Sequence, residues 1–265
     1  MRRQRMPLRI FLILTLLGVQ PLLHAESAEQ KGQAIAAESI ARDTGWGDMK
    51  ADMQMILRNR QGEESLREMR MQSLEQENDG DKSLTVFDKP LDVKGTAFLS
   101  FSHALGADDQ WLYLPALKRV KRISSRNKSG PFMGSEFAYE DLSSFEIEKY
   151  TYKYIRDEVI NGLDCFVVEQ YPVDKNSGYT RRLVWIDKSE YRVQRVEFYD
   201  RKDSPLKTLA YTGYQQYLDK YWRPDRMDMV NHQTGKSTEL RWMNFQFGTG
   251  LKEADFNKNS LKRAR

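Results

Sequence analysis

Residues 48–58 read Asp-Met-Lys-Ala-Asp-Met-Gln-Met-Ile-Leu-Arg, and this stretch decides the fold class. The odd positions from Met49 to Leu57 are all apolar, whereas most of the even positions are polar. Because successive side chains of a strand point to opposite faces, the alternation predicts a β-strand with one apolar face and one solvated face.

Comparable runs continue along most of the chain. Turn residues separate apolar or alternating segments roughly every 8–12 residues, a spacing that is typical of an antiparallel sandwich or barrel. Asn161-Gly162 is a strong signal for a tight hairpin, and Pro224 predicts an edge strand or a bulge. We therefore predict one mainly β domain over residues 26–265, with roughly eleven antiparallel strands and at most about thirteen.

Two segments do not follow the strand pattern. Residues 28–43 carry Ala and Ile at roughly helical spacing, with no Gly or Pro after Gln33, and predict one amphipathic helix. Residues 124–134 are rich in Ser, Asn, Lys, Gly and Pro. Ser135 and the acids that follow it then indicate a short helix or turn.

The first 25 residues have the pattern of a secretion signal. Arg2, Arg3, Arg5 and Arg9 precede an apolar run that is too short to span a bilayer, and Ala25 closes the segment. We predict cleavage after Ala25 and a periplasmic location. Cleavage removes four of the 42 basic side chains and leaves 38, equal to the number of acids, so nucleic-acid binding is not expected.

No residue pattern indicates catalysis or a metal site. The sequence contains no serine-hydrolase, zinc-protease, phosphate-loop or dinucleotide-binding motif, and His103 and His232 are far apart. The single cysteine, Cys165, cannot form an internal disulfide, and its apolar neighbours favour a buried small hydrophobe. Paired acids such as Glu140-Asp141 are expected in solvated turns. We predict a non-enzyme without a metal or another cofactor.

Met and aromatic residues recur at alternate positions and suit a surface that adapts to ligands of variable shape. A large sheet with one helix must close on itself or leave an apolar hollow, which is the default ligand site. The residues predicted to line this hollow are Met53, Met55, Leu57, Met69, Met71, Phe98, Trp111, Tyr113, Phe132, Met133, Phe137, Trp185 and Phe198. For each of them, a place in an ordinary core is the alternative.

A basic run lies near the middle of the chain. Lys118, Arg119, Lys121 and Arg122 are followed by further cations up to residue 128. Charged residues of this kind protect an edge strand against aggregation. The alternative is a docking patch for acidic lipid headgroups or for an acidic partner.

Three blocks of sequence together resemble a known family. They are residues 90–99 (Pro-Leu-Asp-Val-Lys-Gly-Thr-Ala-Phe-Leu), 111–123 (Trp-Leu-Tyr-Leu-Pro-Ala-Leu-Lys-Arg-Val-Lys-Arg-Ile) and 130–142 (Gly-Pro-Phe-Met-Gly-Ser-Glu-Phe-Ala-Tyr-Glu-Asp-Leu). In this order they resemble the exported outer membrane lipoprotein-sorting proteins, which are related to the LolA and LolB carriers. The resemblance extends over about residues 30–261. It implies an open, half-closed antiparallel β-barrel with helical lid segments, whose apolar concave face holds acyl chains in transit. It also implies an association with inner-membrane exporters of the resistance-nodulation-division (RND) type.

These features predict a monomeric periplasmic carrier or accessory protein that binds a lipid or the acyl chains of a lipoprotein. Residues 28–43 and 124–142 are the expected lids, and an RND-type transporter and transient membrane contact are the expected partners. Because the central loop departs from that of the lipoprotein carrier, a hopanoid, a sterol-like molecule or a hydrophobic export substrate is an alternative client. The alternative function is an interaction scaffold that binds no lipid. A hydrolase or an outer-membrane barrel is disfavoured, since catalytic motifs and lipid-facing aromatic girdles are absent from the sequence.

Overall fold

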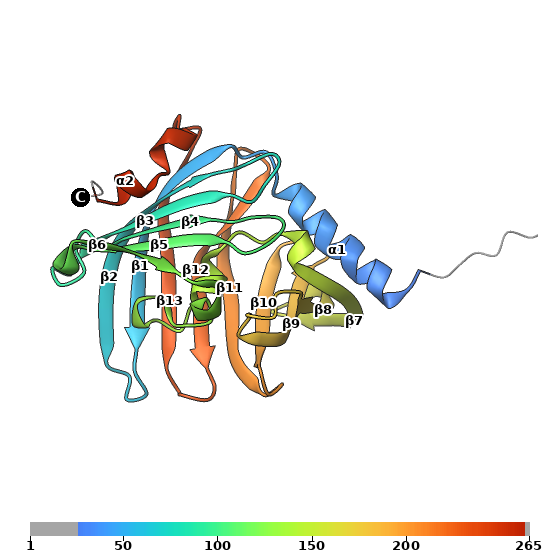
Figure 1. Cartoon of the computed structure of the whole chain (residues 1–265). Helices are drawn as coiled ribbons and strands as arrows, with labels where there is room; N and C mark the ends of the chain where they lie inside the picture. The colour runs from blue at the N-terminus through green and yellow to red at the C-terminus, as the bar shows by residue number, and fades with distance from the viewer. Residues whose placement is uncertain (1–25, 263–265) are drawn as a thin grey trace, which may run out of the picture.

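The computed structural model describes residues 26–262 and contains one antiparallel sheet of thirteen strands (Figure 1). The predicted signal peptide, residues 1–25, lies outside the described residues. The mainly β prediction is confirmed, but the count of roughly eleven strands is too low, because the short middle segments all join the sheet. The strands are β1 (Asp48–Arg58), β2 (Glu64–Leu74), β3 (Lys82–Lys89), β4 (Ala97–Phe101), β5 (Asp109–Leu114), β6 (Arg119–Ile123), β7 (Tyr150–Ile160), β8 (Leu163–Pro172), β9 (Tyr179–Asp187), β10 (Val193–Asp200), β11 (Pro205–Tyr217), β12 (Tyr221–Asn231) and β13 (Ser237–Phe247).

The strand order explains the shape of the sheet. It runs β6-β5-β4-β3-β2-β1-β13-β12-β11-β10-β9-β8-β7, so the two edge strands are consecutive in the chain. The sheet curls, but β6 and β7 do not pair with each other, so the predicted barrel is an open sheet in this structure. Residues 124–149, which we call the crossing segment, must therefore pass from one edge to the other across the open side.

The crossing segment contains short 3-10 turns instead of a continuous helix. It packs into the concave side of the sheet, where its Phe132 and Phe137 are almost fully buried. A bridge between Pro131 and Ala138 closes this part of the segment into a tight loop. The turns in and around the segment are at Pro115–Leu117, Ser125–Asn127, Phe132–Gly134, Tyr139–Leu142 and Ile147–Lys149, and another lies at Glu253–Asp255.

The two edges of the sheet are protected in different ways. Strand β6 carries the exposed cations Arg119, Lys121 and Arg122, which confirms the predicted edge strand. Strand β7 is instead covered by helix α1 (Ala28–Arg42), which confirms the predicted helix at 28–43. Gly32 allows this contact, because a Cβ atom there would lie 2.6 Å from the Tyr154 backbone nitrogen.

The strand periodicity places separate apolar clusters on the two faces of the sheet. The main core lies on the concave face, between the sheet, α1 and the crossing segment. On the convex face, the short helix α2 (Lys258–Leu261) and Phe256 cover Leu84, Leu99 and Trp111. Neither helix within residues 26–262 is long and apolar enough to cross a bilayer.

Candidate functional site

A cavity of about 1260 Å³ lies on the concave side of the sheet. Its walls come from α1, from β1 and its neighbours, from the crossing segment, and from β9 to β13. Six of the residues predicted to line an apolar hollow contribute to it. They are Met53, Met55, Met71, Phe98, Phe132 and Phe137.

Four more predicted residues lie on the same side but away from the cavity. Leu57, Met69, Met133 and Phe198 pack in or against the concave core, where they support the wall without lining it.

The remaining three predicted residues lie in other clusters. Trp111 and Tyr113 pack in the convex cluster below α2, and Trp185 packs with Cys165 and Val167. Their prediction as cavity residues was wrong because β4, β5 and β9 bury both of their faces. In β9, for example, Val184 and Ile186 face the cavity and the intervening Trp185 must therefore point away.

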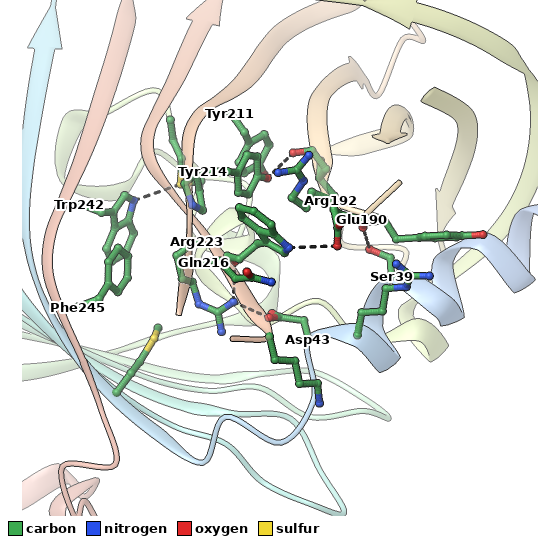
Figure 2. A pocket seen from close by; sticks show the side chains of 18 of the residues that line it. Ser39, Asp43, Glu190, Arg192, Tyr211, Tyr214, Gln216, Arg223, Trp242 and Phe245 are labelled. Atoms are coloured by element: carbon green, nitrogen blue, oxygen red, sulfur yellow. Dashed lines mark hydrogen bonds and ion pairs between the residues drawn. The ribbon is translucent and has the colours of Figure 1, made fainter. Parts of the chain in front are cut away.

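A second pocket of about 570 Å³ adjoins the large cavity, and residues such as Met49, Tyr211 and Trp242 line both (Figure 2). It lies where β12 and β13 separate. Their pairing covers only Arg226–Val230 of β12, so Pro224 is bonded to β11 alone. Pro224 thus lies on a locally free strand edge, although β12 is an interior strand.

A β-bulge builds the aromatic wall of this second pocket. Between Met243 and Gln246, β13 contains one residue more than the facing part of β1, and Asn244 adopts a positive φ of 55°. The extra residue brings Phe245 to the same face as Trp242, and their rings stack with centroids 5.9 Å apart. Tyr211 and Tyr214 face them in Figure 2.

The C-terminal end of α1 is tied to the rim of both pockets. Ser39 Oγ donates a hydrogen bond of 2.7 Å to the Tyr191 carbonyl oxygen, and Arg223 forms an ion pair with Asp43 (Figure 2). Lys220 Nζ also donates to the Thr44 carbonyl oxygen at 2.7 Å. These ties hold α1 against the β9–β10 and β11–β12 turns.

The crossing segment is held by a buried ion pair. Lys207 Nζ lies 2.6 Å from Asp141 Oδ2 and 2.9 Å from the Glu136 carbonyl oxygen, and the two side chains of the pair are only 4% and 6% exposed. Tyr179 donates to the other Asp141 oxygen at 2.8 Å, and burial raises the pKa of this tyrosine. The expectation that Glu140-Asp141 lies in a solvated turn was wrong, since tertiary partners replace the water.

An acidic loop forms one rim of the large cavity. Burial, with smaller effects from Glu146 and Glu75, raises the pKa of Asp81 to about 7. Asp79, two residues away, accepts a hydrogen bond from His103, which lowers its pKa to about 2. The rim thus holds two neighbouring carboxyl groups with opposite shifts.

The predicted docking patch lies away from both pockets. Lys118, Arg119, Lys121 and Arg122 are exposed and lie outside the two pockets, with Arg122 paired to Asp109. Cys165 is fully buried, as predicted, and burial raises its pKa to about 11. Among residues 26–262, no group of three His, Cys, Asp or Glu side chains is arranged to hold a metal ion.

Sequence reasoning missed the polar members of the large cavity. Arg182, Tyr150 and Tyr211 line it, and Arg182 shares the strand parity of Val184 and Ile186. The shared parity was the signal that could have placed Arg182 in the cavity. It was not used, because two consecutive arginines in a strand are ordinarily expected to be solvated.

Comparison with known proteins identifies the family. A model for a family of uncharacterized proteins matches residues 79–263. A crystallised domain from Vibrio parahaemolyticus, named for outer membrane lipoprotein sorting, is 68% identical to this chain. The match covers 89% of this chain and 100% of that domain, with a TM-score of 0.88. The chain belongs to the outer membrane lipoprotein-sorting protein family. The resemblance carried by the three sequence blocks is therefore confirmed.

More distant solved structures share the architecture. A DUF1329 family protein from Desulfovibrio piger is 29% identical, with 89% of this chain and 99% of that chain covered and a TM-score of 0.84. A LolA superfamily protein from Nitrosomonas europaea is 22% identical, with coverages of 86% and 98% and a TM-score of 0.69, which shows a common fold. No curated protein matches the chain.

Proposed function

We propose that this protein is a periplasmic carrier that holds a lipid, or the acyl chains of a lipoprotein, in the large concave cavity. The observation that carries the proposal is the cavity of about 1260 Å³, which is lined by the sheet, α1 and the crossing segment. The name of the Vibrio relative, which refers to outer membrane lipoprotein sorting, supports the same function.

The lining explains how such a ligand would bind without catalytic groups. Met53, Met71 and Phe98 present apolar side chains to the cavity. Each buried methylene group contributes about 0.8 kcal/mol, so a long acyl chain gains several kcal/mol without directional contacts. Release then requires a change that lowers the affinity, and displacement of α1 would open the wall that contains Ala36 and Ile40.

The partner in this proposal is an inner-membrane RND-type transporter, and the exposed cations of β6 provide a docking surface. Arg119→Glu combined with Lys121→Glu should weaken capture of the transporter or of acidic vesicles and leave lipid uptake unchanged, because both residues lie outside the pockets. Loss of lipid uptake in this variant would contradict separate docking and storage.

Lipid extraction followed by mass spectrometry tests the carrier function. Protein purified without detergent should release a stoichiometric lipid, and the emptied protein should bind a fluorescent fatty acid. Ile40→Trp, which fills the cavity from α1, should lower the bound amount several-fold. Ala34→Trp, on the exposed side of the same helix, is the matched control. Absence of extracted lipid together with absence of fatty-acid binding would refute the carrier function.

A further inference from the structure

Arg182 places a guanidinium group in the wall of the large cavity without an acidic partner. It projects from β9 on the cavity-facing parity, next to the apolar residues Val184 and Ile186. Among the described residues, none provides a carboxylate within ion-pair distance of it. The other half-buried cations of the lining are all neutralised, since Lys128 pairs with Asp174, Lys149 with Asp108 and Arg223 with Asp43.

The contacts of Arg182 leave its terminal nitrogens available. Its Nε donates to Gln170 Oε1 at 2.7 Å, and its face stacks on the Tyr150 ring with 4.0 Å to the centroid. Neither terminal nitrogen donates a hydrogen bond to another described residue. These two nitrogens form the edge that binds the two oxygens of a carboxylate or phosphate in parallel, so the stacked guanidinium is fixed with its anion-binding edge free.

Two tyrosine hydroxyl groups accompany this guanidinium. Tyr150 and Tyr211 line the same cavity, and neither hydroxyl has a hydrogen-bond partner within residues 26–262. Burial raises the pKa of Tyr211 to about 12, so its hydroxyl stays protonated and able to donate. Within residues 26–262, the guanidinium edge of this half-buried cation and the two hydroxyl donors have no acceptor, and they lie in the part of the lining that contains Val184 and Ile186. An anionic group bound there would accept from all three.

We propose that Arg182, assisted by Tyr150 and Tyr211, binds the anionic headgroup of an acidic lipid whose tail occupies the apolar part of the cavity. This inference rests on the proposed carrier function and narrows its ligand class to amphiphiles with a carboxylate or phosphate group. A neutral acyl ligand of the same length would leave the guanidinium edge unpaired.

Matched ligands test this assignment in the delipidated full-length mature chain. Hexadecanoate, hexadecyl phosphate and hexadecanol share a tail and differ in charge, and their binding can be followed by calorimetry. The wild-type protein should bind the two anions about tenfold more tightly than the alcohol, as expected for charge-assisted hydrogen bonds. Inorganic phosphate without a tail should not displace them, and displacement would contradict a lipid as the ligand.

Arg182→Gln should abolish the preference for anions and change the affinity for hexadecanol less than about twofold. Arg182→Lys keeps the charge but loses the planar fork, and should retain part of the preference. Lys202→Gln, which removes an exposed cation outside both pockets, is the control and should leave the preference unchanged. Equal binding of acid and alcohol by the wild type, or a preference that survives in Arg182→Gln, would overturn the assignment. Failure of the wild type to bind any of these ligands would instead refute the carrier function itself.

Discussion

Two parts of the chain cover the concave face, and they are attached to the sheet in very different ways. The crossing segment buries Phe132 and Phe137 almost completely and is held by the buried Lys207–Asp141 pair. Helix α1 buries only three residues, and its C-terminal ion pair uses Asp43, whose side chain is 52% exposed. Burial of aromatic and charged groups is costly to reverse, whereas an ion pair whose carboxylate is half exposed to solvent contributes less, about 1 kcal/mol.

The difference separates the two predicted lids. Residues 124–142 are part of the core, and their displacement would expose aromatic rings and an unpaired charge. Residues 28–43 contribute only Ile35 and Ala36 to the core, so their displacement would expose less apolar surface and no buried charge. We therefore expect α1 to be the element that opens, and the crossing segment to be a fixed plug.

The largest loss of stability should follow from breaking the buried Lys207–Asp141 pair. Lys207→Met leaves Asp141 charged and without its cation, and we expect the free energy of unfolding to fall by about 3–5 kcal/mol. Equilibrium denaturation in urea measures the change. Lys188→Met, which breaks the solvent-exposed pair with Asp157, is the control and should lower the stability far less than Lys207→Met does. Equal losses in both variants would mean that the crossing segment is no more firmly held than a surface loop.

A smaller loss of stability is expected when the contact between α1 and β7 is disturbed. Gly32→Ala places a methyl group within 3 Å of the β7 backbone, so the helix must shift, and overpacking of this kind costs about 1–3 kcal/mol. Limited proteolysis should show faster cleavage within α1 while the sheet stays resistant. Gln33→Ala, at an exposed neighbouring position, is the control. If the whole protein became protease-sensitive, α1 and the sheet would unfold together, and α1 would not be a separate lid.

The sequence allowed the elements to be predicted better than their faces. Alternation along residues 48–58 gave β1 because one face of that strand is solvated in part, and the cations of β6 gave an edge strand. Trp111 and Trp185 were assigned to the cavity because they lie in the apolar runs 111–114 and 183–186, where no alternation with charged residues marks which side chains share a face. Arg182 was missed for the opposite reason, since its charge suggested solvent. Only the tertiary packing shows that it lies in the cavity wall beside Val184 and Ile186, and that no carboxylate of residues 26–262 lies within ion-pair distance of it.

The acidic rim contacts the C-terminal end of the crossing segment, where the Asp81 backbone nitrogen donates to Ser144 Oγ at 3.2 Å. Titration of Asp81 therefore tests how this end is held. The folded state raises the pKa of Asp81 from 3.8 to about 7, so it binds more protons than the unfolded state between these values. Wild-type stability attributable to this group must therefore fall as the pH rises through that range. Asp81→Asn keeps the acceptor for the Gln76 nitrogen and should be more stable than the wild type by about 1–2 kcal/mol at pH 8, with a smaller gain at pH 5.

On the same rim, Asp79→Asn should destabilise the protein, whereas Asp81→Asn should stabilise it. The pKa of Asp79 is lowered by its bond to His103, so removal of its charge should reduce the melting temperature. Thermal unfolding of both variants at pH 5 and pH 8 measures these effects. A gain for Asp81→Asn that is the same at both pH values would contradict the titration of Asp81 in this range.

The smallest change in stability, and the most direct test of the lid, concerns the tie at the end of α1. Asp43→Asn weakens the ion pair with Arg223, and because this carboxylate is half exposed, global stability should fall by less than about 1 kcal/mol. The same energy matters far more for a local opening, since 1 kcal/mol changes an opening equilibrium about fivefold. Hydrogen exchange should therefore accelerate by up to about fivefold for amides near Ile40 and remain unchanged in the crossing segment. Glu38→Gln, which breaks only an exposed pair with Arg42 within the helix, is the control. Faster exchange of both covers together would show that they open as one unit, and the distinction between lid and plug would be lost.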